Sequence, residues 1–540
     1  MKIALYGMPC AGKTFIMEKM SNVKVVHGSQ ELNRISGGFF SELSEDEKRD
    51  VRVKYTEYIK SLKDEIIISD GHYSFMEKIA FTEADGELYD VFVYIYCKPE
   101  TLLGRYKTSE KNKKFANNSV AVIEQWQLFE MGSLREECHS RNKDFYVVSD
   151  NETDNCGFAD FLEFVKNGFS SYKLAETICQ EIRKIYPVPG KLYIVDGDKT
   201  IIKQDSFRFC CNGTTFVFDG NFYTGYQSFL FKGELKGYEI PDNKISAIEI
   251  NEAIWKEIKD FNYVILSSGI SDLWAKIGEQ KGLLNIFADP LISADTKYFV
   301  VKLLKEQGYT ITAYGDSKID AFMLREADES ILYIGERISR SLKGEDICGI
   351  HLIYDHAPYV LAKEKKAEIL ADIAICKSDS GINGSFLAGA HLRLGIQLGE
   401  KMATMIPEQN TALLVLERGG RFFGDGFYMG FGGTFYSINP SKEKLPNIKE
   451  DRIVIVDSVI NSGKSIHKMI SDMKAENPTM DIIIATNVIQ KNTLLLFEEY
   501  KVFTVRVSEN SFVGRNQAKQ IGKTGPDTAD RLFNLIERRF

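Results

Sequence analysis

Short apolar segments that end in Gly, Asp or Ser recur along the whole chain, and longer helical patterns separate them. Examples are KIALYG, DEIIISD, KLYIVDG, TITAYGD and RIVIVDS. A strand covered by helices on both faces is apolar throughout, so these segments predict mainly parallel sheets in α/β domains. In such sheets ligands bind beyond the carboxyl ends of the strands. The polar residues that end the segments are therefore the first candidates for functional sites.

The length of the chain predicts several such domains. At roughly 150 residues per domain, a chain of 540 residues corresponds to about three or four. The run YPVPG at residues 186–190 cannot continue a helix and precedes a strand, and a polar loop at residues 377–385 opens another region. The second boundary lies between Asp346 and Ser385. We predict three doubly wound α/β domains with mainly parallel sheets, at residues 1–187, 188–360 and 361–540.

Composition excludes several classes of protein. Hydrophobic residues make up 44% and charged residues 27%, which is typical of a globular protein. The formal net charge of −8 predicts no general attraction to nucleic acid or to an anionic membrane. The start MKIALYG is unlike a signal peptide, no stretch approaches the roughly 20 apolar residues of a membrane span, and the cysteines lack C-x-x-C spacing. We therefore expect a cytoplasmic enzyme with reduced thiols and no membrane partner.

The segment GMPCAGKT at residues 7–14 matches the phosphate-loop pattern G-x-x-x-x-G-K-[ST], and it lies between a strand and a helical pattern, as that motif requires. Gly7 and Gly12 let backbone N–H groups surround a phosphate. Lys13 would reach the β- and γ-phosphates, and Thr14 would hold Mg²⁺. We predict that this loop binds ATP or GTP with Mg²⁺.

Two further features of the first region concern phosphoryl transfer. Asp70 ends a buried strand, where it would hold Mg²⁺ through water, accept the proton of an attacking hydroxyl, or simply cap the next helix. The strand VFVYIYC is followed by Arg105 and several lysines, and this order resembles the strand and basic lid of nucleoside and nucleoside-monophosphate kinases. The resemblance covers roughly residues 1–180. It implies that Arg105, with Arg135 as the second candidate, neutralises the transferring phosphoryl group.

The second region opens with the pattern D-x-D-x-T at the end of a strand. Asp196 would attack phosphorus as a nucleophile, and Asp198 would act as general acid and then as base. Mg²⁺ is needed to screen the approach of a carboxylate to a phosphoryl group. Further partners follow in order along the chain. They are Ser267 as a phosphate donor, Lys297 (or the nearby Lys302) as a cation, and Asp316 and Asp320 as metal ligands beside Asp196 and Asp198.

This ordered set resembles the haloacid dehalogenase (HAD) superfamily, and G-D-S-x-x-D at residues 315–320 resembles its phosphoserine-phosphatase-like branch. The resemblance implies a Rossmann-like core, an Mg²⁺-dependent phosphatase and a cap inserted at about residues 201–262. Aromatic side chains in that cap would either stack on a base or, as is commoner, form a core. The cap residues in question are Phe207, Arg208, Phe216, Phe222, Tyr223 and Tyr226.

In the third region a buried strand, RIVIV, is followed by Asp457 and a loop of small residues that opens a helix. Such a loop cradles an anion, so residues 462–465 would hold the 5-phosphate of a sugar and Asp457 would bind ribose hydroxyls. These loop residues are Ser462, Gly463, Lys464 and Ser465. The loop imitates the tail of a second ATP-binding loop, but the first glycine of that motif is absent.

The segment resembles the PRPP-binding motif of type I phosphoribosyltransferases, and more narrowly that of uracil phosphoribosyltransferase. ERGGRFFGDG at residues 417–426 and GPDTADRLF at residues 525–533 resemble two further elements of that family. The resemblance implies that Arg418 and Gly419 contact pyrophosphate, and that Asp527 and Asp530 lie on the metal or base side. Ser462 and Lys464 depart from the usual Thr and Gly, and residues 508–522 do not match the uracil-recognising stretch. The nucleobase is therefore left open.

Together these motifs predict a multifunctional enzyme of nucleotide metabolism that uses Mg²⁺, ATP or GTP, and PRPP. Its partners would be small nucleotides, a nucleobase and PRPP, and the resemblance to phosphoribosyltransferases implies a possible homodimer. Two alternatives stay open. A kinase joined to an aspartate phosphatase resembles polynucleotide end-healing enzymes, although the acidic net charge counts against it. The third region would otherwise act as a sensor of PRPP or nucleotide in a stress or defence system.

Overall fold

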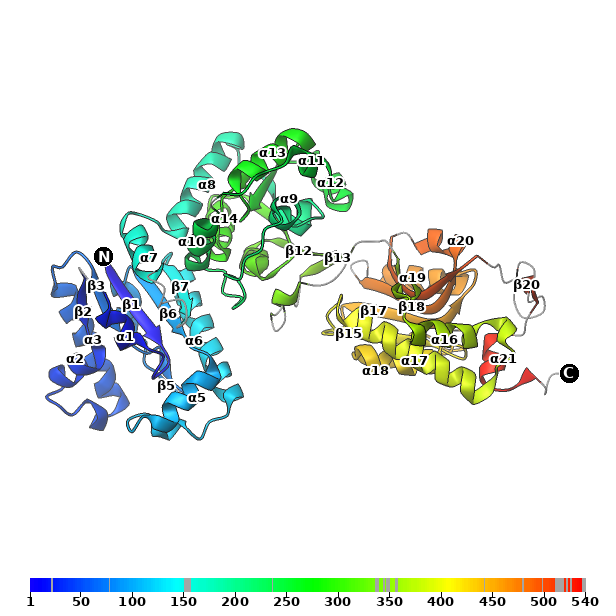
Figure 1. The fold of residues 1–540 in the computed structure, drawn as a ribbon, viewed down its shortest axis with the longest axis horizontal. Helices are drawn as coiled ribbons and strands as arrows, with labels where there is room; N and C mark the ends of the chain where they lie inside the picture. Colours follow the sequence, from blue (N-terminus) through cyan, green and yellow to red (C-terminus); the bar gives the residue numbers. More distant parts are fainter. Residues whose placement is uncertain are drawn as a thin grey trace. The chain divides into compact units, whose positions relative to one another are not determined.

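The computed structural model describes the chain except for residues 21–22, 77, 150–156, 236, 336–338, 343–344, 346–349, 355–357, 441, 478–479, 498, 510–518, 521–522, 525–526 and 537–540. The chain forms two compact units, Met1–Ile331 and Leu332–Phe540, and each is described by itself. Three large, mainly parallel sheets are present, and this α/β architecture confirms the predicted fold class (Figure 1). The limits of three separate domains stay a prediction.

The first sheet is parallel, with the strand order β2-β3-β1-β6-β7. Its strands are β1 (Lys2–Gly7), β2 (Lys24–Val26), β3 (Ile67–Asp70), β6 (Val91–Tyr96) and β7 (Asp144–Ser149). Both faces are buried: Ile3 and Leu5 belong to one core, and Ala4 and Tyr6 belong to the other. Because both faces of β1 are buried, its sequence is apolar from Ile3 to Tyr6. The accompanying helices are α1 (Lys13–Glu18), α2 (Gly28–Ile35), α3 (Glu45–Ser61), α4 (Glu83–Leu88), α5 (Pro99–Thr108), α6 (Val120–Ser140), α7 (Gly157–Lys166) and α8 (Ser171–Ile185).

The second sheet has the order β10-β9-β8-β11-β12-β13. Its strands are β8 (Lys191–Val195), β9 (Tyr263–Ser267), β10 (Ile286–Ala288), β11 (Thr310–Gly315), β12 (Glu329–Ile334) and β13 (His351–Tyr354). β8, β9, β10 and β11 pair in parallel, so their polar carboxyl ends meet at one edge. The helices outside the cap segment are α13 (Ser271–Lys281), α14 (Ala294–Glu306) and α15 (Ala321–Glu326).

In the segment predicted as a cap, the structure describes four helices, which lie on either side of residue 236. They are α9 (Ser206–Cys211), α10 (Gly225–Glu234), α11 (Asp242–Ser246) and α12 (Glu252–Ile258). Phe207 and Tyr226 are buried, and Tyr226 belongs to the core of the first sheet. For these two side chains the commoner alternative, packing in a core, is the correct one. Phe216 is 78% exposed and packs in no core.

The cap segment also completes the edge of the first sheet. β7 is an edge strand, and at Val147 its N–H donates to Thr224 Oγ1 (3.2 Å) while its carbonyl accepts from Gln227 Nε2 (2.7 Å). Helices α8 and α14, one from each side of the predicted boundary at residue 187, pack against each other. The first two regions are thus joined by buried contacts as well as by the chain.

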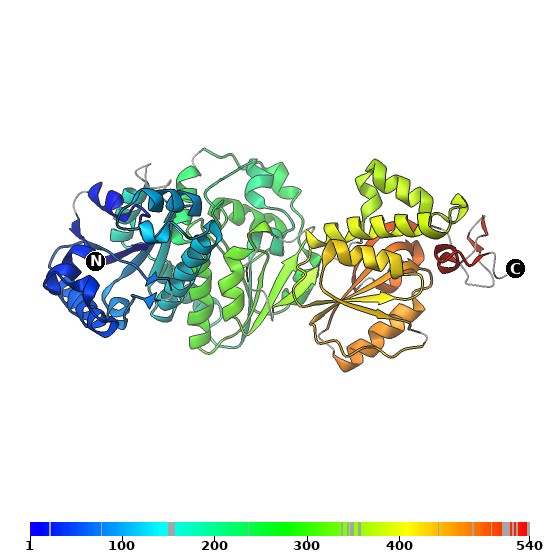
Figure 2. The ribbon, with the colours of Figure 1, turned by 90° about the horizontal axis from the view of Figure 1, so that it is seen from below.

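The third sheet is parallel and has the order β14-β19-β18-β17-β15-β16. Its strands are β14 (Tyr359–Val360), β15 (Thr411–Leu416), β16 (Thr434–Ile438), β17 (Arg452–Ile460), β18 (Asp481–Gln490) and β19 (Lys501–Ser508). Helices α17 (Gly384–Ala403) and α18 (Arg421–Phe431) lie on one side of the sheet and α19 (Lys464–Glu476) on the other (Figure 2). α17 and α18 pack so closely that a Cβ on Gly426 would lie 2.0 Å from the carbonyl oxygen of Leu392. The shorter helices are α16 (Ala367–Cys376), α20 (Lys491–Leu494) and α21 (Thr528–Leu532).

The described residues also include two short antiparallel pairs of strands: β4 (Ser74–Phe75) with β5 (Lys78–Ile79), and β20 (Lys519–Gln520) with β21 (Lys523–Thr524). Most of the stretch predicted to recognise the base, residues 508–522, lies outside the described residues. Among the residues that the structure does describe, no helix is long and apolar enough to cross a membrane.

Candidate active sites

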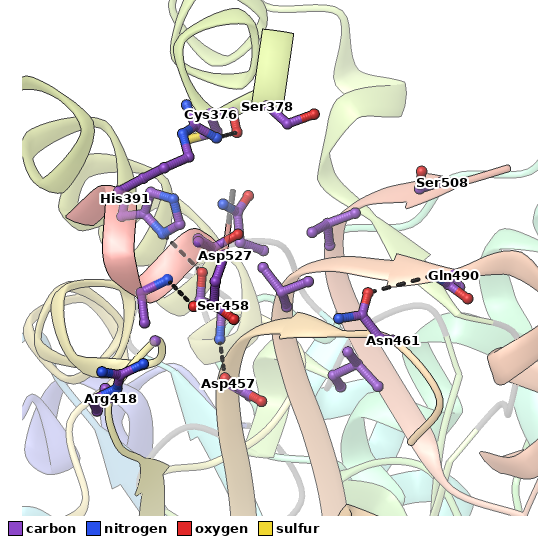
Figure 3. Close-up of a pocket in the computed structure, with 18 of the residues that line it drawn as sticks. Cys376, Ser378, His391, Arg418, Asp457, Ser458, Asn461, Gln490, Ser508 and Asp527 are labelled. Carbon is purple, nitrogen blue, oxygen red and sulfur yellow. Dashed lines mark hydrogen bonds between the residues drawn. The ribbon is translucent and has the colours of Figure 1, made fainter. Parts of the chain in front are cut away.

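A cavity of about 300 Å³ opens at the carboxyl edge of the third sheet (Figure 3). Four residues predicted from sequence line it together: Arg418, Gly419, Asp457 and Asp527. They come from the end of β15, the end of β17 and the residue before α21, so only the fold brings them together. Arg418 Nη2 also donates to Asp530 (3.4 Å), which places that fifth predicted residue beside the cavity.

The anion loop lies next to this cavity. Asn461 lines the cavity, whereas the four residues that follow it, Ser462 to Ser465, are not among the lining residues. Ser462, Lys464 and Ser465 are exposed. Gly463 adopts φ +66°, and a Cβ there would lie 2.8 Å from Thr493 Cγ2, so the turn requires glycine.

Asp457 has an unusual protonation equilibrium. Burial raises its pKa to about 7, although the backbone N–H groups of Ser458 and Val459 lower it; the Asp527 charge raises it further. One of these hydrogen bonds runs from Ser458 N to Asp457 Oδ1 (2.7 Å). At neutral pH the carboxyl is divided between two states, and a polyol or a cation at the site would favour the ionised one.

The cavity is also lined by polar residues to which the sequence patterns assigned no role. They are Cys376, His391, Asn487, Arg506 and Arg531. His391 Nδ1 contacts Ser458 Oγ at 2.9 Å, and burial together with the charges of Arg531 and Arg506 lowers the pKa of the imidazole to about 3. Within the described structure, His391 Nε2 and Asn487 Oδ1 are buried and have no hydrogen-bond partner. The ring is therefore neutral, and two polar atoms of residues beside the cavity are buried without a hydrogen bond.

A signal for two of these residues was present in the sequence. Asn487 interrupts the apolar run of β18 and Arg506 interrupts that of β19, near the carboxyl ends of both strands. Arg531 has another role: it is 1% exposed and donates to the carbonyls of Lys377 and Ile382, so it ties α21 to the loop before α17.

A second cluster lies at the carboxyl edge of the second sheet. Carboxylate oxygens of Asp196, Asp316 and Asp320 lie within 4.8 Å of one another. Lys297 Nζ donates to Asp196 and, at 2.7 Å, to Asp320. Lys297 is fully buried; burial lowers its pKa, but the two carboxylates outweigh burial and raise it overall. Three hard oxygen donors fit Mg²⁺, and the lysine balances part of their charge.

The pKa values of the two D-x-D aspartates are both raised. Burial and then the charge of Asp320 raise the pKa of Asp196 to about 6. Burial and then the charge of Asp205 raise that of Asp198 to about 7. Asp198 lies outside the three-carboxylate cluster and instead accepts from Ser206 N (2.8 Å). The geometry therefore does not support the prediction of Asp198 as a side-chain metal ligand, since its carboxylate is directed to the backbone of α9.

Two more predictions concern this cluster. A Cβ on Gly197 would lie 2.7 Å from Ser267 Oγ, so Ser267 is next to the D-x-D loop. Between the two lysines the structure decides clearly: Lys302 donates to His139 O (2.8 Å) and Asn142 Oδ1 (2.7 Å), and Lys297 alone of the pair contacts the carboxylates.

Comparison with models of known protein families finds a match to one region of the chain. Residues 392–535 match the uracil phosphoribosyltransferase family. The match contains β15 to β19 and most residues that line the cavity of the third sheet. No curated protein matches the chain.

Similar solved structures include the AQ2163 protein from Aquifex aeolicus, at 15% identity over 33% of this chain and 97% of that one, with a TM-score of 0.27. Another is a HAD-family hydrolase, t0658, from Salmonella enterica serovar Typhi, at 17% identity over 32% of this chain and 75% of that one, with a TM-score of 0.24. At these TM-scores neither likeness bears on fold or function.

In the segment predicted as a phosphate loop, residues 7–14, the lysine side chain binds the backbone of its own loop. Lys13 is 6% exposed, and its Nζ donates to Gly7 O (2.5 Å) and Met8 O (3.0 Å). Burial lowers the pKa of this amine to about 8, against the opposing charges of Asp70 and Glu130. Gly7 and Gly12 have φ values of +150° and +101°, which only glycine adopts easily. Thr14 is exposed at the start of α1.

The other residues predicted for this site make different contacts in the structure. Asp70 Oδ1 accepts from Gly28 N (2.7 Å) at the start of α2, a helix that precedes Asp70 in the chain and is therefore not the following helix of the capping alternative. Arg105 Nη1 donates to Cys10 O (3.0 Å), which holds its guanidinium against the loop. Arg135 cannot serve as the second candidate, because its guanidinium is buried in a bidentate pair with Asp295.

Proposed function

We propose that residues 361–540 transfer a phosphoribosyl group from PRPP to a nucleobase. One observation carries the proposal: Arg418, Asp457 and Asp527 line a single cavity inside the segment that matches the uracil phosphoribosyltransferase family. Pyrophosphate would leave the anomeric carbon through a cationic ribosyl transition state, and a base nitrogen would attack that carbon. Asp457 would accept from ribose hydroxyls, Arg418 would pair with pyrophosphate, and residues 462–465 would hold the 5-phosphate.

The test is a panel of nucleobases incubated with the full chain, PRPP and Mg²⁺. We expect pyrophosphate and a new nucleotide with at least one base, and Asp457→Asn should reduce turnover at least about a hundredfold, since it removes the acceptor for ribose. Asp472→Asn, an exposed position on α19, is the matched control. If PRPP binds but no base yields pyrophosphate, the region is a sensor and the enzymatic proposal fails.

A second activity, phosphomonoester hydrolysis, is favoured by the contact of Lys297 with Asp196 and Asp320. An Asp196 oxygen would attack phosphorus, and the leaving oxygen would take a proton from Asp198, whose pKa of about 7 keeps that proton available. Water activated by the same Asp198 would then release phosphate. Mg²⁺ held by Asp196, Asp316 and Asp320 would neutralise charge on the phosphoryl oxygens.

Hydrolysis of p-nitrophenyl phosphate by the full chain tests this second activity. Turnover should need Mg²⁺, disappear with EDTA, and fall at least about a thousandfold in Asp196→Asn. The exposed Asp272→Asn on α13 should match the unsubstituted protein. Turnover that persists in Asp196→Asn would rule out the nucleophile assignment.

For the whole chain we propose a multifunctional enzyme of nucleotide metabolism, acting in the cytoplasm. The phosphate loop with Lys13 and the adjacent Arg105 supports binding of ATP or GTP and phosphoryl transfer to an unidentified acceptor. Kinase and phosphatase acting on one phosphate would cancel each other, so we expect different phosphate positions. Salt-dependent binding of a single-stranded oligonucleotide would instead favour polynucleotide end-processing.

A further inference from the structure

A buried charge cluster joins α6 of the first region to α14 of the second. Arg135 Nε and Nη2 donate to the two carboxylate oxygens of Asp295 at 2.7 and 2.9 Å, and His139 Nε2 lies 2.7 Å from Asp295 Oδ1. Asp295 is 1% exposed, Arg135 8% and His139 5%. The His139 ring stacks on Tyr298 with centroids 3.9 Å apart, and Arg135 lies 4.2 Å from the ring centre of Phe322. Every polar partner of Asp295 in this cluster thus comes from α6.

Asp295 lies two residues before Lys297, the lysine of the proposed phosphatase site. Asp295 and Lys297 lie in the first turn of α14, which begins at Ala294. Residues two apart on a helix face nearly opposite sides. On one side Asp295 is held by α6, and on the other Lys297 reaches Asp196 and Asp320. The same helical turn is therefore held between the first region and the proposed phosphatase site.

We infer that Arg135 and His139 are positioning residues for the phosphatase, supplied by the region that carries the phosphate loop. The inference rests on the proposed phosphatase function. A bidentate guanidinium–carboxylate pair sets direction as well as distance, and a buried ion pair selects one register of packing. Lys297 touches the phosphoryl site, and a displacement of about 1 Å at such a group lowers turnover by roughly a hundredfold.

The experiment compares full-length variants by p-nitrophenyl phosphate turnover and by hydrogen exchange of the peptide covering residues 290–300. In Arg135→Gln we expect kcat to fall about 10–100-fold with KM nearly unchanged. We also expect faster hydrogen exchange at the start of α14. Arg135→Lys keeps the charge but not the bidentate geometry, so it should fold even where Arg135→Gln does not, with kcat reduced severalfold. Glu306→Gln changes an exposed residue at the far end of α14, away from Lys297 and from the Asp295 cluster, and it should leave kcat unchanged.

The outcomes separate this inference from the function on which it rests. If Arg135→Gln and Glu306→Gln lower kcat alike, or if Arg135→Lys has full turnover and normal exchange, the positioning role is wrong. If the unsubstituted protein has no turnover, the proposed phosphatase fails. In that case the exchange data still test the contact by itself: unchanged exchange at residues 290–300 in the Arg135 variants shows that α6 does not hold this turn, and faster exchange confined to the turn shows that it does.

Discussion

Asn487 lines the cavity of the third sheet, and its side-chain carbonyl oxygen is buried beside that cavity with no partner among the described residues. Such an atom costs free energy unless a ligand donates to it. We predict that Asn487→Ala raises KM for the nucleobase by about 10–100-fold, equivalent to roughly 1–3 kcal/mol, and leaves KM for PRPP nearly unchanged. Initial rates with each substrate varied in turn give both constants. Equal effects on both would place Asn487 outside the base site.

His391 predicts a dependence of stability on acid. Its pKa in the folded protein is about 3, below the value of about 6.5 in an unfolded chain. Stabilisation by the neutral ring is complete above pH 6.5 and is lost as the pH falls toward 3, because only the unfolded chain then binds the proton. At pH 5 the expected loss is about 2 kcal/mol, or roughly 5 °C in Tm.

Calorimetry of the full chain and of His391→Asn at pH 7 and pH 5 measures this loss. Asn cannot titrate, so the transition that the substitution affects should depend less on pH in the variant than in the unsubstituted protein. The comparison also removes the opposite contribution of Asp457, which both proteins contain. An identical pH dependence in the two proteins would contradict the assignment of a buried, neutral His391.

At the level of elements, the apolar runs predicted the parallel strands, because a strand buried on both faces has no room for polar side chains. The same runs could not show that α10 completes the edge of β7. That contact depends on Thr224 and Gln227, which are polar, lie in a predicted cap and meet Val147 some 80 residues away.

Gln227 supplies a prediction for this edge. Its amide donates to Val147 O and accepts from Thr224 N, so Gln227→Leu leaves two buried backbone groups unpaired. We expect a loss of about 1–3 kcal/mol for each group. Urea unfolding followed by tryptophan fluorescence is suitable, since all three tryptophans lie in Met1–Ile331. The exposed Gln280→Leu is the control, and equal midpoints for the two variants would refute the edge contact.

At the level of the whole molecule, the predicted boundary at residue 187 does not separate two independent bodies, because Tyr226 packs in the first core and Asp295 pairs with Arg135. We predict that a fragment of residues 1–187 melts without a cooperative transition and is rapidly proteolysed, whereas a fragment of residues 1–360 remains folded. Limited proteolysis and melting curves of both fragments check this. A stable, cooperatively folding 1–187 fragment would disprove the shared core.

The sequence by itself determined the α/β class, and it predicted a phosphate loop, a D-x-D pair and an anion loop after Asp457. Each of these depends on residues within a few positions of one another, so local backbone geometry is enough to recognise it. Tertiary structure alone decided that Lys297 and not Lys302 contacts the carboxylates, and that Asp198 lies outside their cluster. It decided as well that Arg135 pairs with Asp295 of α14. It also revealed His391 and Asn487 in the cavity. The physical reason is that these partners are separated by up to 160 residues, and only the packing of helices on parallel sheets brings them within hydrogen-bonding distance.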